Sequence, residues 1–330
     1  MPRVSVVVPF YNVQDCVDYC VKSLLDQTYR DYELVLVDDG STDSTPEKLD
    51  AYSNEPNVVV LHKENGGLSD ARNAGVAVSS GELISFVDGD DLVSPDYLDV
   101  LVGAFPEGVN ALVTALPDIV QYSEVKSWQW RSAAPVEKES LARYEALLKV
   151  AYEEIQISGW AKLAPRSVYL RTPFPQGAYY EDVCTIVDVI ASVDNVVALK
   201  APIYGYVMRD DSIVHRKSAS RKQADDYRQA IDKIVSDMNK SMVAPEAIVY
   251  HRSLHLTRLF TLLDVVTDRA YARHLQATIV RRVRSDLWVI LRNQRAPLPM
   301  KCRFAALALL PGIYGSIFRF YEKRFKGIGK

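Results

Sequence analysis

Gly-Glu-Leu-Ile-Ser-Phe-Val-Asp-Gly-Asp-Asp, residues 81–91, is the stretch that decides the fold. The apolar run from Leu83 to Val87 is typical of a strand buried on both faces. Three carboxylates follow within four residues, those of Asp88, Asp90 and Asp91. Negative charge gathered at the end of a buried strand needs compensation by a cation or by hydrogen-bond donors. Taken alone, the stretch also fits a solvated acidic turn, because short motifs often match by chance.

Similar apolar runs precede this strand and alternate with helical patterns. They predict strands at 4–8, 34–37 and 58–61, and helices at about 15–26 and 71–78. This alternation predicts βαβ units on a mainly parallel sheet, which is an α/β fold. Ligands on such sheets bind beyond the carboxyl ends of the strands. We therefore expect Pro9–Tyr11, Asp38–Asp39 and Asp88–Asp91 to meet in one cleft.

The chemistry of the acidic strand end points to a divalent cation. Hard oxygen ligands favour Mg²⁺ or Mn²⁺ over Zn²⁺. Both ions usually bind through one or two carboxylates together with substrate phosphates. The sequence therefore predicts a site for Mn²⁺ or Mg²⁺ that carries a diphosphate.

The middle and end of the chain give weaker patterns. We expect a strand at 111–116, a helix at about 140–152 and another helix that begins at Glu181-Asp182. The Pro-rich stretch between them, through Pro165, Pro173 and Pro175, favours loops on an acceptor side over sheet core. Beyond about residue 218 the pattern is helical. We therefore predict a catalytic domain at 1–218 and a helical, basic extension at 219–330.

Composition is that of an ordinary globular protein, with 48% hydrophobic and 25% charged residues in 330. The four cysteines show no metal-ligand spacing. Cys16 and Cys20 lie four residues apart on a predicted helix, where a structural disulfide is not expected, so a reducing cytoplasm is the expected compartment. Because Val4–Val8 already reads as a strand, a secretory leader is not expected before it.

The net charge of −3 hides an asymmetry between the two parts of the chain. Residues 281–330 carry a net +10, which leaves −13 for the first 280 residues. Basic clusters alternate there with apolar ones, and the run 304–310 is far short of the ~20 residues that span a bilayer. A basic amphipathic helix on an anionic membrane fits this pattern, which would place the protein peripherally on the inner face of the cell membrane. Two alternatives stay open, a tail that packs on the protein and a homo-oligomer contact. Nucleic-acid binding is not expected, because no stacking platform accompanies the charge.

Five ordered blocks of sequence resemble the family 2 glycosyltransferases, which have the GT-A fold. They are VSVVVPFYN at 4–12, LVLVDDGSTD at 34–43, GGLSDARNAG at 66–75, GELISFVDGDD at 81–91 and Tyr180-Glu181-Asp182. The resemblance covers about residues 3–215 and implies an inverting enzyme that uses a nucleotide-sugar donor and usually a divalent metal. Nothing comparable covers the tail.

The resemblance implies a donor-binding set at the first strands. Pro9 and Tyr11 match the family's first nucleotide-binding turn, where an aromatic face packs on base and ribose. Asp39 matches the residue that hydrogen-bonds uracil, with a helix cap as its alternative role. Arg72 matches a diphosphate or base contact, which suits a guanidinium. Pairing of Arg72 with the Asp88–Asp91 carboxylates is the alternative.

The resemblance also implies roles around the metal. Asp88 is expected on the ribose or sugar, Asp90 on the metal and Asp91 on the sugar or metal. Gly89 lets the backbone approach closely. His215 matches a distal ligand of the metal or diphosphate, although a lone histidine is as often a surface or core residue.

Inversion requires a base that takes the proton of the attacking acceptor hydroxyl. Asp182 matches that base in the family, with Glu181 as its neighbour; such a base contributes about 10²–10⁴-fold to the rate. Two carboxylates at a helix start also fit simple stabilisation by the helix dipole. Trp160 matches a residue that shapes the sugar pocket, and core packing is its alternative.

Together these residues predict a metal-dependent inverting glycosyltransferase. It would move a sugar from a nucleotide-sugar, UDP-linked by the resemblance, to a hydroxyl of a glycan or lipid-linked glycan acceptor of a bacterial surface polysaccharide. A nucleotidyltransferase is a rival enzyme, but it would need a Gly-rich loop where this chain has PFYN. A catalytically silent GT-A-like binding or scaffold subunit of a polysaccharide assembly complex is the rival of another class.

Overall fold

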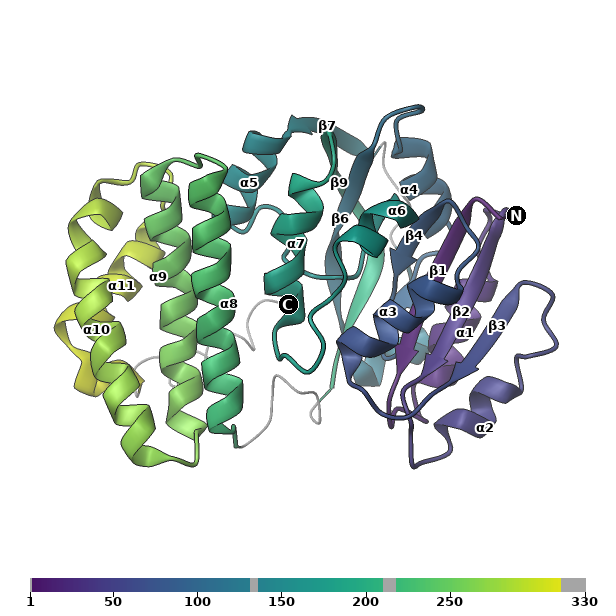
Figure 1. The fold of residues 1–330 in the computed structure, drawn as a ribbon, viewed down its shortest axis with the longest axis horizontal. Helices are drawn as coiled ribbons and strands as arrows, with labels where there is room; N and C mark the ends of the chain where they lie inside the picture. The colour runs from purple at the N-terminus through teal and green to yellow at the C-terminus, as the bar shows by residue number, and fades with distance from the viewer. Residues whose placement is uncertain (1, 131–135, 210–217, 316–330) are drawn as a thin grey trace. The chain divides into compact units, whose positions relative to one another are not determined.

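A computed structural model describes residues 2–130, 136–209 and 218–315 of the chain. The chain divides into two compact units, Met1–Ser212 and Ile213–Lys330. The sheet lies in the first unit and the second is helical in its described part (Figure 1).

The first unit is built on one mixed sheet with the strand order β3-β2-β1-β4-β8-β6-β9-β5, and β7 pairs with β9. Strands β1 to β4 are parallel to one another, and β8 runs antiparallel to both β4 and β6. The sheet is thus parallel on the β3 side and mixed beyond β4, which confirms the predicted fold class. The strands are β1 Val4–Phe10, β2 Tyr32–Asp38, β3 Val58–His62, β4 Leu83–Phe86, β5 Leu92–Val93, β6 Ala111–Gln121, β7 Glu137–Ala142, β8 Lys162–Pro165 and β9 Asn195–Met208.

Helices cover both faces of this sheet, because alternate residues of β1 are apolar on both sides. Val6 and Val8 belong to the core that includes apolar residues of α1 and α4. On the opposite face α3 packs so closely that a Cβ on its Gly75 would lie 2.3 Å from Val7 Cγ1. Helices α3, α6 and α7 are seen on one side of the sheet in Figure 1. The helices of this unit are α1 Val17–Leu25, α2 Thr45–Asp50, α3 Leu68–Val78, α4 Tyr97–Ala104, α5 Arg143–Ala151, α6 Arg166–Arg171 and α7 Glu181–Ala191, with a 3₁₀ turn at Tyr122–Ser127.

One expectation for the middle of the chain is wrong, and one expected helix is found with a later start. The Pro-rich stretch expected to be loops contributes β8, which lies between β4 and β6 inside the sheet. Pro165 is tolerated because it is the last residue of that strand. The helix expected from residue 140 begins instead at Arg143, since residues 137–142 pair with β9 as β7.

In its described part, residues 218–315, the second unit packs four helices, α8 Arg221–Lys240, α9 Pro245–Leu262, α10 Arg269–Arg292 and α11 Leu298–Leu309. Helix α8 begins with a capping box, in which Ser220 Oγ accepts from the Gln223 amide at 3.1 Å. The buried Phe304 of α11 meets Tyr250 of α9 edge-on, with ring centroids 5.8 Å apart. The inner face of α11 therefore belongs to the core of this unit. Within the described ranges, no helix combines the length and apolarity needed to span a bilayer.

Candidate active site

The carboxyl ends of β2, β1 and β4 lie side by side at one edge of the sheet. Phe10 pairs with Asp38 across β1 and β2, and Val7 pairs with Phe86 across β1 and β4. Gly89 packs directly on this edge, since a Cβ there would lie 2.6 Å from the Pro9 carbonyl oxygen and closer still to the Phe10 ring. The polar residues that follow the three strands are therefore neighbours in space, as the sequence predicts.

Arg72 of α3 lies at the centre of this edge and is fully buried. Its Nη2 donates to Asp88 Oδ1 at 2.8 Å, and its Nη1 donates to Glu181 Oε1 at 2.8 Å and to Asp182 Oδ1 at 2.7 Å. Its guanidinium also lies 5.1 Å from the centre of the Phe174 ring. Arg72 thus joins the end of β4 to the first turn of α7.

This cluster holds more negative than positive charge, and the pKa values reflect it. Burial, reinforced by Asp90 and Asp182, raises the pKa of Asp88 to about 6 against the opposing effect of Arg72. Burial and the neighbouring Asp182 raise the pKa of Glu181 to about 7. Because one guanidinium serves three carboxylates, the site favours a further cation or a proton.

Asp90 and Asp91 have different surroundings although they are adjacent. Asp90 Oδ2 accepts from Arg209 Nη2 at 2.7 Å, and its side chain is 28% exposed. Asp91 is buried, and its carboxylate accepts from Tyr204 Oη at 2.6 Å and from the Val207 amide at 2.8 Å. Burial raises the pKa of Asp91 well above its usual value. Asp91 therefore ties the end of β4 to β9, whereas Asp90 faces the open side.

Asp39 is a buried acceptor that shapes the loop at 63–67. Its carboxylate accepts from Lys63 Nζ at 2.7 Å, from the Gly66 amide at 3.0 Å and from the Gly67 amide at 2.8 Å. The helix-cap alternative does not describe it, because Asp43 accepts from the Thr45 amide at the start of α2. On the same edge Pro9 is buried and Tyr11 is half-exposed.

Trp160 lies on the aromatic side of the site. Its ring stacks on Tyr204 with centroids 4.7 Å apart, and the Tyr204 hydroxyl accepts from the Asp88 amide at 3.2 Å. Beside it, Gly159 has no room for a side chain, because a Cβ would lie 3.0 Å from Arg72 Cζ and 3.1 Å from Asp182 Oδ1. The segment before β8 is thus one wall of the Arg72 cluster.

Lys162 is a buried charge that the sequence did not reveal. Its Nζ donates to Ser158 Oγ at 3.1 Å and to the Trp160 carbonyl at 3.4 Å. Burial lowers the pKa of Lys162 to about 7, and the nearby Asp182 opposes that shift. Its position inside a four-residue strand between apolar neighbours is the only sequence signal of burial. Lys162 holds the Ser158–Trp160 wall in place.

Of the two residues predicted to bind the metal, the structure describes Asp90, whereas His215 lies outside the described residues. Among the residues that the structure describes, no group of three or more His, Cys, Asp or Glu side chains converges as a metal cage. Asp90 and Asp88 still offer the one or two carboxylates that Mg²⁺ or Mn²⁺ uses beside substrate phosphates.

A mixed sheet with an acidic strand end facing a helix-start carboxylate pair defines a GT-A glycosyltransferase. The glycosyl transferase family 2 model matches residues 5–170. The chain belongs to this family and is a glycosyltransferase, for which an inverting mechanism fits in general.

Relatives and solved structures agree with this assignment. Glycosyltransferase GlyG of Streptococcus pneumoniae is 31% identical over 241 residues, which are 71% of this chain and 80% of GlyG. The fold is similar to S. aureus TarS 1–349 in complex with UDP-GlcNAc, with a TM-score of 0.63, 18% identity and coverage of 96% of this chain and 88% of that one. It is also similar to the mannosyltransferase PcManGT of Pyrobaculum calidifontis in complex with GDP-Man and Mn²⁺, with a TM-score of 0.51, 17% identity and coverage of 96% and 83%.

Proposed function

We propose that this glycosyltransferase is metal-dependent and inverting, and that it moves a sugar from a UDP-sugar to a hydroxyl of a glycan or lipid-linked glycan in surface-polysaccharide assembly. The observation that carries the proposal is the buried Arg72, which holds Asp88, Glu181 and Asp182 together beside Asp90. The residues that the family pattern assigns to donor binding, to the metal and to the base therefore lie close together at one edge of the sheet.

The donor is assigned to the edge formed by β1 and β2. Tyr11 is half-exposed above the buried Pro9 and offers a ring for the base and ribose. Asp39 supports this surface by holding the 63–67 loop. The UDP-GlcNAc bound to TarS and the GDP-Man bound to PcManGT make both nucleotides donors to test.

Asp90 would hold the divalent ion, with His215 as a further proposed ligand, and Asp88 would contact the ribose or sugar. The hard carboxylate oxygens of Asp90 suit Mn²⁺ or Mg²⁺, and the excess negative charge around Arg72 favours a cation. When bound, the ion supplies Lewis-acid stabilisation of the departing diphosphate. Asp90 also pairs with Arg209 at 2.7 Å, so Arg209 and the ion would compete for this carboxylate.

Asp182 is the proposed base. Its side chain is 22% exposed and one of its oxygens is fixed by Arg72 at 2.7 Å. The carboxylate takes the proton of the acceptor hydroxyl as that oxygen attacks opposite the leaving group. Arg72 orients Asp182 through this contact. Glu181 also pairs with Arg72, so its carboxylate still balances the positive charge of Arg72 after Asp182 has taken up the proton.

The experiment measures nucleoside diphosphate released from UDP- and GDP-sugars with Mn²⁺ and a panel of glycan acceptors. Asp182→Asn is expected to lower the rate about 10²–10⁴-fold, because the amide cannot accept the proton. Asp194→Asn is the matched control, since Asp194 is an exposed aspartate after the same helix and should retain activity. An Asp182→Asn enzyme as fast as the parent would contradict the base assignment.

We also propose that the second unit holds the enzyme on the cytoplasmic face of an anionic membrane. Seven of the eight described large apolar side chains exposed in this unit lie within 288–313. They are Trp288, Val289, Leu291, Leu298, Leu309, Leu310 and Ile313. This stretch belongs to the part of the sequence with a net charge of +10. Apolar and basic side chains together favour an anionic lipid surface.

A further inference from the structure

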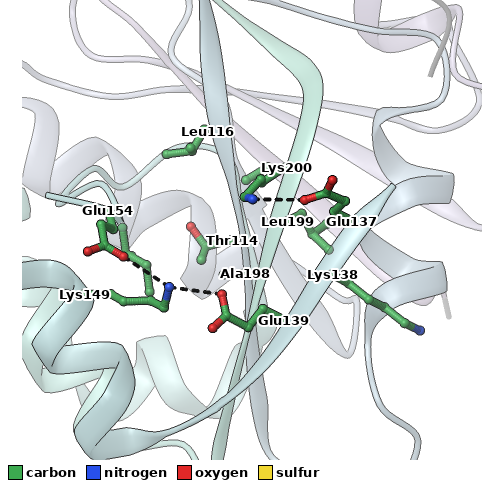
Figure 2. Close-up of a pocket in the computed structure, with 12 residues that line it drawn as sticks. Thr114, Leu116, Glu137, Lys138, Glu139, Lys149, Glu154, Ala198, Leu199 and Lys200 are labelled. Carbon is green, nitrogen blue, oxygen red and sulfur yellow. Dashed lines mark hydrogen bonds and ion pairs between the residues drawn. The ribbon is translucent and has the colours of Figure 1, made fainter. Parts of the chain in front are cut away.

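A cavity of about 330 Å³ lies in the first unit, and the residues that line it do not belong to the Arg72 cluster. Strands β6, β7 and β9 and the end of α5 enclose it (Figure 2). Its apolar lining includes Leu116, Ile155 and Leu199. Its size is at the lower end of the range of small-molecule sites, about 300–1,000 Å³.

The charged side chains around this cavity compensate one another. Lys149 Nζ lies 3.0 Å from Glu139 and 3.1 Å from Glu154, and Lys200 Nζ lies 2.9 Å from Glu137. Figure 2 shows these ion pairs as two separate groups among the residues that line the cavity. The three glutamates would repel an anionic ligand, and the lysines would repel a cationic one. The lining therefore selects an uncharged ligand.

The same lining suits a ligand rich in hydroxyl groups. Carboxylates accept from hydroxyls and ammonium groups donate to them, while the apolar floor can cover the face of a sugar ring. The Glu137–Lys200 pair is largely exposed, and such pairs are worth only about 0–1 kcal/mol; in the Glu139–Lys149 pair the glutamate is the exposed partner. Exchanging them for hydrogen bonds to a ligand costs little. Uncharged carbohydrate is the chemical class that combines these features.

The register of the sheet places the cavity next to the Arg72 cluster. Thr114 lines the cavity and pairs directly with Lys162 across β6 and β8, so both side chains stand on one face of the sheet. The Ala115 amide also donates to the Ala161 carbonyl at 3.0 Å. Gly159 is three residues before Lys162, and a Cβ built on it would lie 3.1 Å from Asp182 Oδ1. One strand spacing, three residues at full extension and this last step separate cavity and base by at most roughly 20 Å.

We infer that this cavity is a distal subsite for an uncharged glycan acceptor, whose reacting hydroxyl lies at Asp182 while a preceding sugar occupies the cavity. The inference rests on the proposed glycosyl transfer. It adds that specificity for the acceptor is set partly by β6, β7 and α5, outside the residues of the family pattern.

The test is direct binding of tetrasaccharides to the full chain. Uncharged tetramers of glucose, galactose and N-acetylglucosamine and the polyanion tetragalacturonate are titrated and followed by ligand-observed NMR. Leu116→Trp fills the cavity from an exposed position, and Leu170→Trp on α6 is the matched control at another exposed leucine. Glu139→Gln, which removes one acceptor oxygen at an exposed site, serves if Leu116→Trp fails to fold. Thermal stabilisation by UDP with Mn²⁺ reports folding and donor binding in each variant.

We expect at least one uncharged tetramer to bind the parent and Leu170→Trp more tightly than the polyanion does. Leu116→Trp should weaken that binding at least 10-fold, and Glu139→Gln should weaken it several-fold. Failure of the parent to bind any uncharged tetramer, tighter binding of tetragalacturonate, or equal binding by Leu116→Trp would overturn the subsite. None of these results touches the proposed function, which fails separately if the parent releases no nucleoside diphosphate from any donor.

Discussion

At the scale of single residues, Arg72 explains most of the candidate site. The sequence left open whether Arg72 contacts a diphosphate or pairs with the acidic strand end, and in the structure it pairs with Asp88. Its additional pairing with Glu181 and Asp182 could not be read from sequence, because these residues are about 110 positions away. The sequence identifies which types of residue the reaction needs. Only the tertiary fold shows that three carboxylates share the guanidinium of Arg72.

The burial of Asp88 predicts a pH-dependent stability. The pKa of Asp88 is about 6 in the folded chain against an ordinary value of 3.8, so the folded state binds the proton more tightly. This contribution is fully present below about pH 4 and is lost as the pH rises through about 6. Between pH 4 and 7, the free energy of unfolding of the parent should fall by roughly 1–3 kcal/mol relative to that of Asp88→Asn.

Urea unfolding at several pH values measures this difference. Asp194→Asn is the control, because it makes the same chemical change at an exposed aspartate outside the Arg72 cluster. A constant difference between the parent and Asp88→Asn from pH 4 to 7 would show that Asp88 is not raised in the folded state.

At the scale of elements, the predicted βαβ units are found where the periodicity is strong. β1, β2, β3 and β4 follow the apolar runs, and α3 begins three residues before the predicted start at 71. β8 and the 14-residue β9 were missed, for two physical reasons. β8 has four residues and ends in Pro165, which reads locally as a turn. Antiparallel insertion between β4 and β6 is a long-range pairing that local patterns do not encode.

The contact between α3 and β1 gives a prediction at this scale. Gly75→Ala places a methyl group 2.3 Å from Val7 Cγ1, so α3 must shift away from the sheet. We expect destabilisation of about 1–3 kcal/mol, as in other overpacked cores. Glycosyl transfer should fall as well, because Arg72 is carried on the same helix.

Gly103→Ala is the matched control, a helical glycine of α4 with open space around its Cβ position. Alanine there should be neutral or stabilising by up to about 1 kcal/mol, since it is the better helix former. Thermal unfolding and the rate of nucleoside diphosphate release measure both effects. Equal stability of the two variants would contradict the tight packing of α3 on β1.

At the scale of the whole molecule, the sequence foresees a sheet-bearing part and a helical, basic part. It also foresees the meeting of the strand ends, because parallel strands share an edge by geometry. What it could not foresee is how the apolar tail residues divide between core and surface. Phe304, Leu307 and Ala308 are buried, whereas Leu309 and Leu310 are more than half exposed.

This division decides how membrane association should be tested. Deleting residues 300–330 would remove Phe304 and Leu307 from the core of the second unit and so would unfold part of it. Point changes at exposed positions avoid that effect. The double variant Trp288→Ser and Leu298→Ser removes side chains that are 62% and 72% exposed, and Met242→Ser is the control at a residue that is 83% exposed outside 288–313.

Sedimentation with vesicles of phosphatidylglycerol and phosphatidylcholine provides the measurement. The parent and Met242→Ser should sediment with these vesicles but not with phosphatidylcholine alone, because each basic residue near an anionic surface contributes about 1 kcal/mol. Binding should weaken as salt rises, since charges are screened beyond about 8 Å at 0.15 M salt. The double variant should bind at least several-fold more weakly, because it lacks two apolar side chains that would enter the lipid interface. If the parent stays in the supernatant, or the double variant sediments as well as the parent, the exposed residues of 288–313 have another role and the membrane proposal is wrong.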